Sequence, residues 1–353
     1  MAARTPVVES QLEAPIYVRQ LPQVRLGMAW FIAVVLFAGG LAAWEWKWRA
    51  YGAGPGYRNS DSLWAMQRRR IDQGEGNGTV LIGASRVFFD LQLPVWERVA
   101  GARPIQLAME GTTPLPMLED LADDPDFTGR LLVGIAPDVF FSGYQERKGV
   151  VDHYRKETPT QHAGQRLSMW FLEPFFAFYD PDYALTQVLK RQRWPVRPGV
   201  ENYLDVRRLA VHGSDRNARM WSKVETDPEY QALAKSIWAQ FFDYPAPPDA
   251  AQIMEEQIRR AAAAVAKLRA RGVDVVFVRP PSDAEYLAYE NRTLPRAETW
   301  DVLLARAGAR GIHFEDHPEL QGYWHPEWSH LSGAEADRFT EALVGILKRD
   351  FGW

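Results

Sequence analysis

The stretch Val80-Leu81-Ile82-Gly83-Ala84-Ser85-Arg86 decides the fold, because it runs from a short apolar segment through a glycine and a small residue to a serine. Four similar apolar runs follow along the chain, at residues 104–108, 131–135, 273–278 and 311–315. Stretches with helical periodicity lie between them. This alternation predicts parallel strands joined by crossover helices, and hence an α/β domain whose first strand begins at Thr79.

Two of the predicted helices have recognisable ends. In the first, Asp249 is a candidate N-cap, apolar residues follow at spacings of three or four, and Gly272 ends the helix before the fourth strand. In the second, Ser332 and Glu335 form a capping box for a helix over about 333–347. Both helices begin or end beside a predicted strand, as crossover helices do.

The N-terminal region contains a run of 19 residues without a charge, from Leu26 to Trp44. As a helix it would be about 28 Å long, enough to cross a bilayer. Trp44, Trp46 and Trp48 cluster at its end, where indole rings favour the membrane interface. The Trp-Glu-Trp-Lys-Trp-Arg stretch at the end of the run offers no small-x-small cleavage site, so a cleaved signal peptide fits poorly. A soluble core helix fits poorly too, because it would carry polar residues. We predict a transmembrane anchor over residues 26–46.

The chain as a whole has the composition of a globular protein. Of its 353 residues 46% are hydrophobic and 24% are charged, and the net charge of -4 argues against nucleic acid as a partner. There is no cysteine, which excludes disulfides, thiolate zinc sites and cysteine nucleophiles. We predict a cytoplasmic tail over 1–25, a Gly- and Pro-containing linker over 47–75, and an α/β domain over 76–353. Three basic residues flank the anchor on each side, so charge alone does not set its orientation.

More than a hundred residues separate the third and fourth predicted strands, which is far more than a crossover needs. We predict a helical insertion at about 142–248. It contains an aromatic stretch at 169–179 and a basic stretch at 190–197. These stretches fit a surface that faces a membrane or a partner, with arginines for anionic headgroups. They fit equally a helical subdomain that buries its aromatic side chains against the sheet.

Three segments should meet at the carboxyl edge of the sheet, where open parallel sheets bind their ligands. Ser85 lies in the turn that leaves the first strand, and its backbone N–H could help to hold an oxyanion. Gly111 follows the second strand and could supply another backbone N–H. His330 precedes the last helix, and Glu327, three residues earlier, could hold the imidazole for Ser85.

In this order the segments resemble the SGNH/GDSL superfamily of hydrolases and acyltransferases, over the soluble part outside the insertion. The resemblance implies a flavodoxin-like three-layer fold with a parallel sheet, Ser85 as nucleophile, His330 and Glu327 as its partners, and Ser85 and Gly111 in the oxyanion hole. Gly-Ala-Ser-Arg and the anchor resemble the branch that modifies cell-envelope polymers, which includes alginate acetylation proteins and the teichoic-acid D-alanylation protein D.

The sequence departs from this family in two places. The family's third block, G-x-N-D, uses its Asn side chain to hold the oxyanion, whereas residues 134–138 carry Ala136 and Pro137 at the two candidate positions. Loss of such a donor costs about 100-fold in rate or more, so Arg86 or Arg279 could substitute for it or bind substrate. Glu327 replaces the family's Asp, which we regard as minor.

A group of histidines and carboxylates could compete with these roles. It consists of His313, Glu315, Asp316, His317 and His325. Their spacing matches no metal-binding motif, so we predict no metal. The serine chemistry implies no cofactor.

These observations predict a serine esterase or O-acyltransferase that forms an acyl-enzyme on Ser85 and acts on acyl esters of a glycan or other envelope polymer. The resemblance implies a single-pass protein of the bacterial inner membrane with its soluble domain in the periplasm, working beside a membrane-bound O-acyltransferase. Because the third-block amide is missing, a weakly active or inactive SGNH-like subunit that organises a polysaccharide-modifying or export complex is the alternative. Accidental motif matches in an unrelated anchored α/β protein are a third interpretation.

Overall fold

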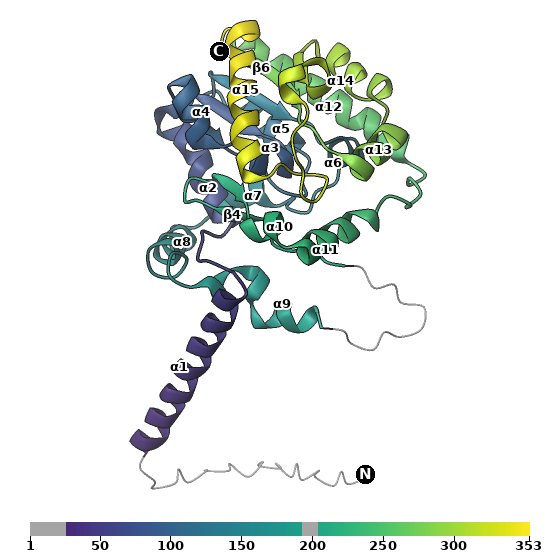
Figure 1. The fold of residues 1–353 in the computed structure, drawn as a ribbon. Coiled ribbons are helices and arrows are strands. Elements are labelled where there is room, and N and C mark those ends of the chain that lie inside the picture. Colours follow the sequence, from purple (N-terminus) through teal and green to yellow (C-terminus); the bar gives the residue numbers. More distant parts are fainter. Residues whose placement is uncertain (1–25, 193–203) are drawn as a thin grey trace, which may run out of the picture. The chain divides into compact units, whose positions relative to one another are not determined.

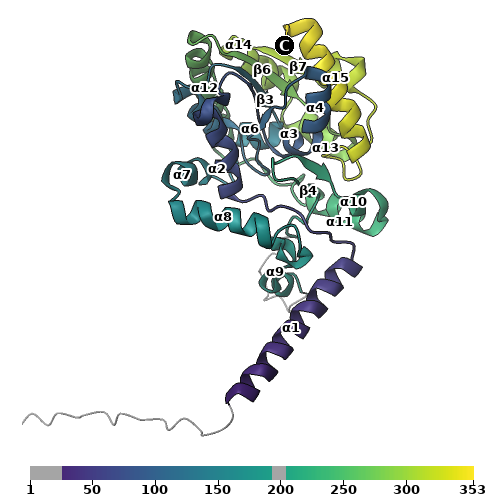
Figure 2. The same cartoon turned by 90° about the vertical axis from the view of Figure 1, so that its left-hand side faces the viewer.

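The computed structural model describes residues 26–192 and 204–353 (Figures 1 and 2), and these divide into two units, one up to Lys47 and the other from Trp48 to Trp353. The predicted tail over 1–25 lies outside the described residues. Helix α1 (Leu26–Ala50) has a mean hydropathy of 2.2 over its most apolar window, and none of that window is buried. By length and composition it is long and apolar enough to span a membrane, at the place where the sequence predicts an anchor.

The core of the second unit is a five-stranded parallel sheet, so the prediction of an α/β protein is confirmed. Its strands follow the spatial order β2-β1-β3-β6-β7, and each neighbouring pair is parallel. The strands are β1 (Thr79–Ile82), β2 (Ile105–Gln106), β3 (Arg130–Gly134), β6 (Asp274–Arg279) and β7 (Arg310–His313). Each lies within or overlaps one predicted apolar run.

Alternate strand residues face two separate hydrophobic clusters on opposite sides of the sheet, because successive side chains of a strand point in opposite directions. Leu81 and Leu132 pack with helices α3 (Ser85–Asp90), α4 (Leu93–Ala100) and α15 (Gly333–Phe351). Val80 and Val133 pack with α5 (Leu115–Asp123), α6 (Pro137–Ser142), α12 (Ala250–Ala270) and α14 (Trp300–Ala307). Helices therefore cover both faces of the sheet, as Figure 2 shows.

The structure corrects the predicted linker over 47–75. Residues from Asp61 onward form helix α2 (Asp61–Arg70) and a short π-helix (Ile71–Glu75). Leu63 and Trp64 of α2 are fully buried, and the Trp64 indole donates a hydrogen bond of 2.9 Å to the carbonyl of Leu107. Apolar burial thus holds this segment in the domain, and helical structure replaces the predicted linker after Ser60.

Between β3 and helix α12 the described residues form small elements, mostly helices. They are α6, α7 (Val150–Lys156), α8 (Pro159–Phe171), two 3-10 turns (Ala177–Tyr179 and Pro181–Tyr183), α9 (Leu185–Lys190), an antiparallel pair β4 (Ala210–His212) and β5 (Ala218–Met220), α10 (Ser222–Thr226) and α11 (Pro228–Ala239). Residues 193–197 of the predicted basic stretch lie outside the described residues. The aromatic stretch is not buried against the sheet, because Trp170, Phe171 and Phe175 are exposed.

The last part of the chain brings the predicted site residues to the sheet. Helix α13 (Ala284–Thr293) and 3-10 turns at Arg296–Glu298, Phe314–Asp316 and Pro318–Leu320 surround β7. A loop then leads to α15, where half of the predicted capping box is present: the Ser332 side chain accepts a hydrogen bond from the Glu335 backbone N–H, whereas the Ser332 N–H donates to the carbonyl of Trp324 and not to the Glu335 side chain. His330 lies in this loop, two residues before the cap.

Candidate active site

Ser85 is the first residue of α3, directly after β1 and its Gly83-Ala84 turn. The short helix packs very closely on the sheet: a Cβ at Gly83 or at Gly134 would collide with the side chain of Val87. Only glycine allows this approach at both positions. The glycines therefore fix the start of α3 against the ends of β1 and β3, where the Ser85 side chain is partly exposed.

The Ser85 hydroxyl, the His330 imidazole and the Glu327 carboxylate form one hydrogen-bonded chain. His330 Nε2 lies 2.7 Å from Ser85 Oγ, and His330 Nδ1 lies 2.7 Å from Glu327 Oε1. Ser85 and His330 are 245 residues apart in sequence. Glu327 and His330 are buried, with 0% and 1% of their surface exposed. The structure thus brings together the three side chains that the sequence singled out.

Glu327 is held from three directions. Its Oε1 also accepts the backbone N–H of His330 at 2.7 Å, and its Oε2 accepts a hydrogen bond from the indole N–H of Trp238. Burial alone would raise the pKa of Glu327, but the nearby His330 and these hydrogen bonds hold it below its usual value. Glu327 is therefore an anion oriented toward Nδ1 of His330, which favours the tautomer with Nε2 free to accept a proton from Ser85.

The backbone between the two partners is strained. Trp328 has a φ of 75°, in the left-handed region that non-glycine residues seldom adopt. Its carbonyl accepts a hydrogen bond of 2.8 Å from the backbone N–H of Asp283, which ties the loop to the segment after β6. This turn lets Glu327 reach both the backbone and the ring of His330 within three residues.

Two residues of this environment were missed from the sequence. Trp238 comes from α11, in the segment between β3 and β6. Asp90 ends the helix that Ser85 begins; it is fully buried and accepts the Leu331 backbone N–H at 3.0 Å. Burial raises the pKa of Asp90 to about 7, although His330 lowers it in part. In the sequence, the one sign of a role for Asp90 is that it lies five residues after Ser85, within one short helix.

The structure contains only part of the expected set of oxyanion donors, whereas all three members of the Ser85–His330–Glu327 chain are present. Gly111 has a φ of 54°, and a Cβ there would collide with the carboxylate of Glu146. Burial and the neighbouring Glu110 raise the pKa of Glu146. At the end of β3, Ala136 caps α6 and Pro137 begins it, so no side-chain amide is present at either position.

The next residue, Asp138, does not replace that amide. It is a carboxylate, which lacks the amide N–H that would donate to an oxyanion, and its Oδ2 accepts a hydrogen bond of 2.6 Å from the hydroxyl of Tyr286. Backbone N–H groups at Ser85 and Gly111 are therefore the candidates for an oxyanion hole.

Arg86 and Arg279 form a buried ion-pair cluster. Arg86 Nη1 lies 2.9 Å from Glu290 Oε1, and Arg279 Nη2 lies 2.7 Å from Glu290 Oε2. Burial would raise the pKa of Glu290, but the two arginines hold it below its usual value. Both arginines are nearly inaccessible, so their charges are neutralised inside the protein and a substrate-binding role would require opening the cluster. Arg86 Nε also contacts Ser329 Oγ at 3.4 Å, beside His330.

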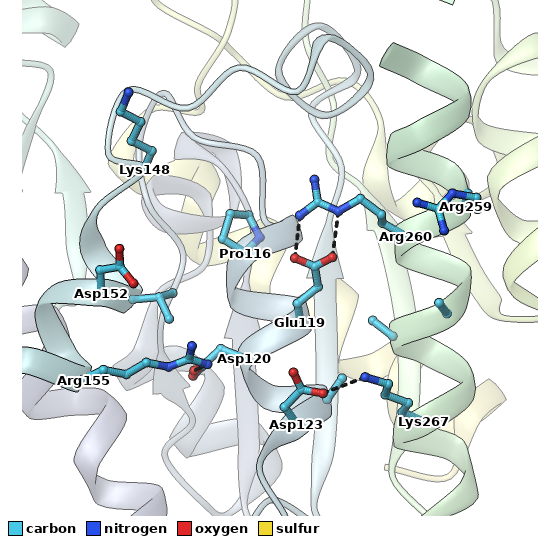
Figure 3. Close-up of a pocket in the computed structure, with 14 residues that line it drawn as sticks. Pro116, Glu119, Asp120, Asp123, Lys148, Asp152, Arg155, Arg259, Arg260 and Lys267 are labelled. Atoms are coloured by element: carbon cyan, nitrogen blue, oxygen red, sulfur yellow. Dashed lines mark hydrogen bonds and ion pairs between the residues drawn. The ribbon is translucent and has the colours of Figure 1, made fainter. Parts of the chain in front are cut away.

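A pocket lies away from the Ser85 site, between α5, α7 and α12 (Figure 3). Its volume is about 460 Å³, and its lining residues do not include Ser85, Glu327 or His330. Its charged side chains are largely paired with one another, as in the Arg260–Glu119 and Lys267–Asp123 ion pairs. Among residues 26–192 and 204–353 there is no cluster of His, Asp and Glu that could hold a metal ion.

The candidate active site is thus defined by its geometry alone. No protein-family model matches the chain, and no curated protein matches it in sequence.

Proposed function

We propose that this protein is a membrane-anchored serine esterase or O-acyltransferase of SGNH/GDSL type. One observation supports the proposal most strongly: the continuous chain of hydrogen bonds from Ser85 Oγ through both ring nitrogens of His330 to Glu327. In this order the imidazole can act as a base that activates the serine hydroxyl as a nucleophile, and the buried carboxylate orients the imidazole and stabilises its protonated form.

The proposed reaction proceeds through an acyl-enzyme. His330 Nε2 accepts the Ser85 proton while Ser85 Oγ attacks the ester carbonyl, and the resulting oxyanion is held by the backbone N–H groups of Ser85 and Gly111. The carbon–oxygen bond of the ester then breaks, and His330 returns the proton to the departing alkoxide. Water or a sugar hydroxyl, deprotonated by His330, attacks the acyl-enzyme and releases Ser85. Glu327 stabilises the imidazolium formed in both steps.

Three features support assignment to the SGNH/GDSL type. The strand order β2-β1-β3-β6-β7 is the flavodoxin-like order, with the long helical insertion between its third and fourth strands in sequence. Ser85 follows the first strand, and the last loop carries the acid and the histidine three residues apart. Helices cover both faces of the sheet.

The proposed substrate is an acyl ester of an extracytoplasmic glycan or envelope polymer, in the periplasm, with a membrane-bound O-acyltransferase as partner. This part rests on the apolar helix α1 and on the family resemblance. It is tested by adding one cysteine at the C-terminus of the cysteine-free chain and treating intact cells with an impermeant maleimide. Labelling only after lysis would place the domain in the cytoplasm.

A weakly active or inactive subunit is the second candidate, and one observation favours it. No side-chain amide replaces Ala136 or Pro137, and the Glu146 carboxylate lies against Gly111, where it would repel an oxyanion. Such a subunit would organise an envelope polysaccharide-modifying complex without turning over substrate itself.

A fluorophosphonate probe separates the two candidates, because it reacts with an activated serine without needing the natural substrate. We expect the detergent-solubilised full-length protein to be labelled, and Ser85→Ala and His330→Ala to abolish labelling. Ser142→Ala is the matched control, since Ser142 is exposed and lies outside the site. A folded wild-type protein that resists the probe, or labelling that survives in Ser85→Ala, would overturn the proposal of catalysis.

A further inference from the structure

Most of the large apolar side chains that are exposed in the described part of the second unit lie between residues 167 and 206. They are Leu167, Trp170, Phe171, Leu172, Phe175, Phe176, Leu185, Leu189, Leu204 and Val206. Trp170, Phe171 and Phe175 are 61%, 63% and 57% exposed. We call Leu167, Trp170, Phe171, Phe175 and Phe176 the aromatic surface. Soluble proteins rarely leave such side chains contiguous in solvent without a partner.

The polar side chains of Gln165, Ser168 and Glu173, among or beside these residues, are in contrast directed into the protein. Glu173 is 1% exposed, and its carboxylate accepts hydrogen bonds from the Arg58 backbone N–H at 3.0 Å and the Ser168 hydroxyl at 2.7 Å. Gln165 of α8 donates to Glu173 at 3.1 Å and accepts from the Ser60 hydroxyl at 2.8 Å. These hydrogen bonds hold Gln165, Ser168 and Glu173 inward, and the side chains of the aromatic surface are left outward.

The aromatic surface adjoins the last turn of α1. Trp48 stacks on Tyr183 with ring centroids 4.6 Å apart, and Arg49 Nη2 donates a hydrogen bond of 2.8 Å to the carbonyl of Phe175. Arg49 lies only five residues after Trp44, where the apolar run ends, which corresponds to about 7.5 Å along a helix. The polar headgroup layer of a bilayer is about 5–8 Å thick on each side. Phe175 is therefore hydrogen-bonded to a residue that follows the end of the apolar run by about the thickness of one headgroup layer.

We propose that the aromatic surface binds the lipid bilayer that α1 spans, with its side chains inserted at the level of the headgroups and upper acyl chains. Trp and Phe are the side chains that favour this zone. Arg166, beside Leu167, is exposed and forms no ion pair with any described residue, so it is available to an anionic headgroup. The second unit is then attached to the membrane by α1 and by this surface. The proposal does not depend on the catalytic role of Ser85.

The absence of cysteine allows a direct test on the full-length chain. Phe171→Cys and Leu167→Cys, each carrying a nitroxide label, are reconstituted in liposomes of phosphatidylcholine with a minority of phosphatidylglycerol. Accessibility to dissolved oxygen, which concentrates in lipid, is compared with accessibility to a water-soluble nickel complex. The matched control is Ala266→Cys, an exposed position on α12, which Figure 2 shows well away from α8.

We expect both labels on the aromatic surface to be severalfold less accessible to the nickel complex than the Ala266→Cys label, and more accessible to oxygen. Labels at 167 and 171 that are as accessible to nickel as the control would overturn the proposal. Protection that appears in native membranes but not in these liposomes would also overturn it, because a membrane protein would then be the partner of this surface.

Discussion

In folded proteins polar side chains are usually exposed and large apolar side chains are usually buried. The Ser85 site departs from the first rule, and the aromatic surface departs from the second. At the site, Glu327, His330 and Asp90 are charged or polar groups buried almost completely. On the aromatic surface, Trp170 and Phe171 are apolar groups left mostly exposed. Folding free energy favours neither arrangement, because polar groups lose hydration when buried and apolar groups gain from burial. Both regions are therefore candidates for function.

The two regions also differ in the contacts that compensate for this unfavourable burial or exposure. Glu327 and His330 are hydrogen-bonded to one another and to backbone, so the cost of their burial is offset within the protein, whereas Asp90 has a partner for Oδ1 but none for Oδ2. The exposed apolar groups have no such compensation inside the second unit, and the polar network around Glu173 keeps them outward. The site should thus be sensitive to single substitutions, whereas the aromatic surface should tolerate them.

The largest effect is expected from Glu327→Gln. The amide keeps the size of the side chain but removes the negative charge that stabilises the imidazolium and selects the His330 tautomer. We expect kcat for hydrolysis of p-nitrophenyl acetate to fall about a thousandfold or more. Circular dichroism at the same protein concentration controls for folding. Retention of more than a tenth of the wild-type kcat would mean that Glu327 does not act through His330.

Asp90→Asn should change stability with pH. In the unfolded chain a carboxyl of this type ionises near pH 4, whereas Asp90 in the fold has a pKa of about 7. The folded protein therefore binds the extra proton between these values, and stability falls as pH rises from about 4 to 7. An amide side chain at this position cannot ionise, so we expect the variant to be more stable than wild type at pH 8, by up to about 4 kcal/mol, and similar at pH 4. Urea unfolding at both pH values measures the free energy of unfolding of each protein. If the variant and the wild type differ by the same amount at pH 4 and at pH 8, burial of Asp90 does not raise its pKa.

Trp238→Phe should act through Glu327. It removes the indole N–H that helps to hold the pKa of Glu327 below its usual value, and it keeps an aromatic ring in place. We expect about a tenfold lower kcat, and a loss of activity on the acid side that begins at higher pH than in wild type. Trp324→Phe, at an exposed tryptophan, is the control. A lower kcat with an unmoved pH profile would show that Trp238 acts only by packing.

The features that depend on the local order of apolar and polar residues could be predicted from the sequence. Short apolar runs between amphipathic stretches located the five strands, and the carboxyl ends of parallel strands meet at one edge, which brought Ser85 toward the loop of His330. The charge-free run located α1 because length and hydropathy are properties of the segment alone.

The missed parts depend on tertiary contacts. Nothing near Trp238 in sequence indicates that its indole meets Glu327, 89 residues away. Helix α2 falls in the predicted linker because that prediction rests on the Gly and Pro content after the anchor, which gives no sign that Leu63 and Trp64 are buried in the domain. The sequence suggests Arg86 as a substrate-binding residue, because it does not show that this arginine is paired. Its partner, Glu290, is 204 residues away along the chain.

The smallest effect is expected on the aromatic surface. The double variant Trp170→Ser/Phe171→Ser removes two rings that make little apolar contact within the fold, so the free energy of unfolding should change by less than about 0.5 kcal/mol. Phe88→Ala, at a fully buried ring beside the site, should lose about 3–5 kcal/mol in the same denaturation experiment. A cost for the double variant close to that of Phe88→Ala would mean that these rings stabilise the fold itself. A negligible cost, together with loss of membrane protection at Leu167, would mean that they are retained for the bilayer.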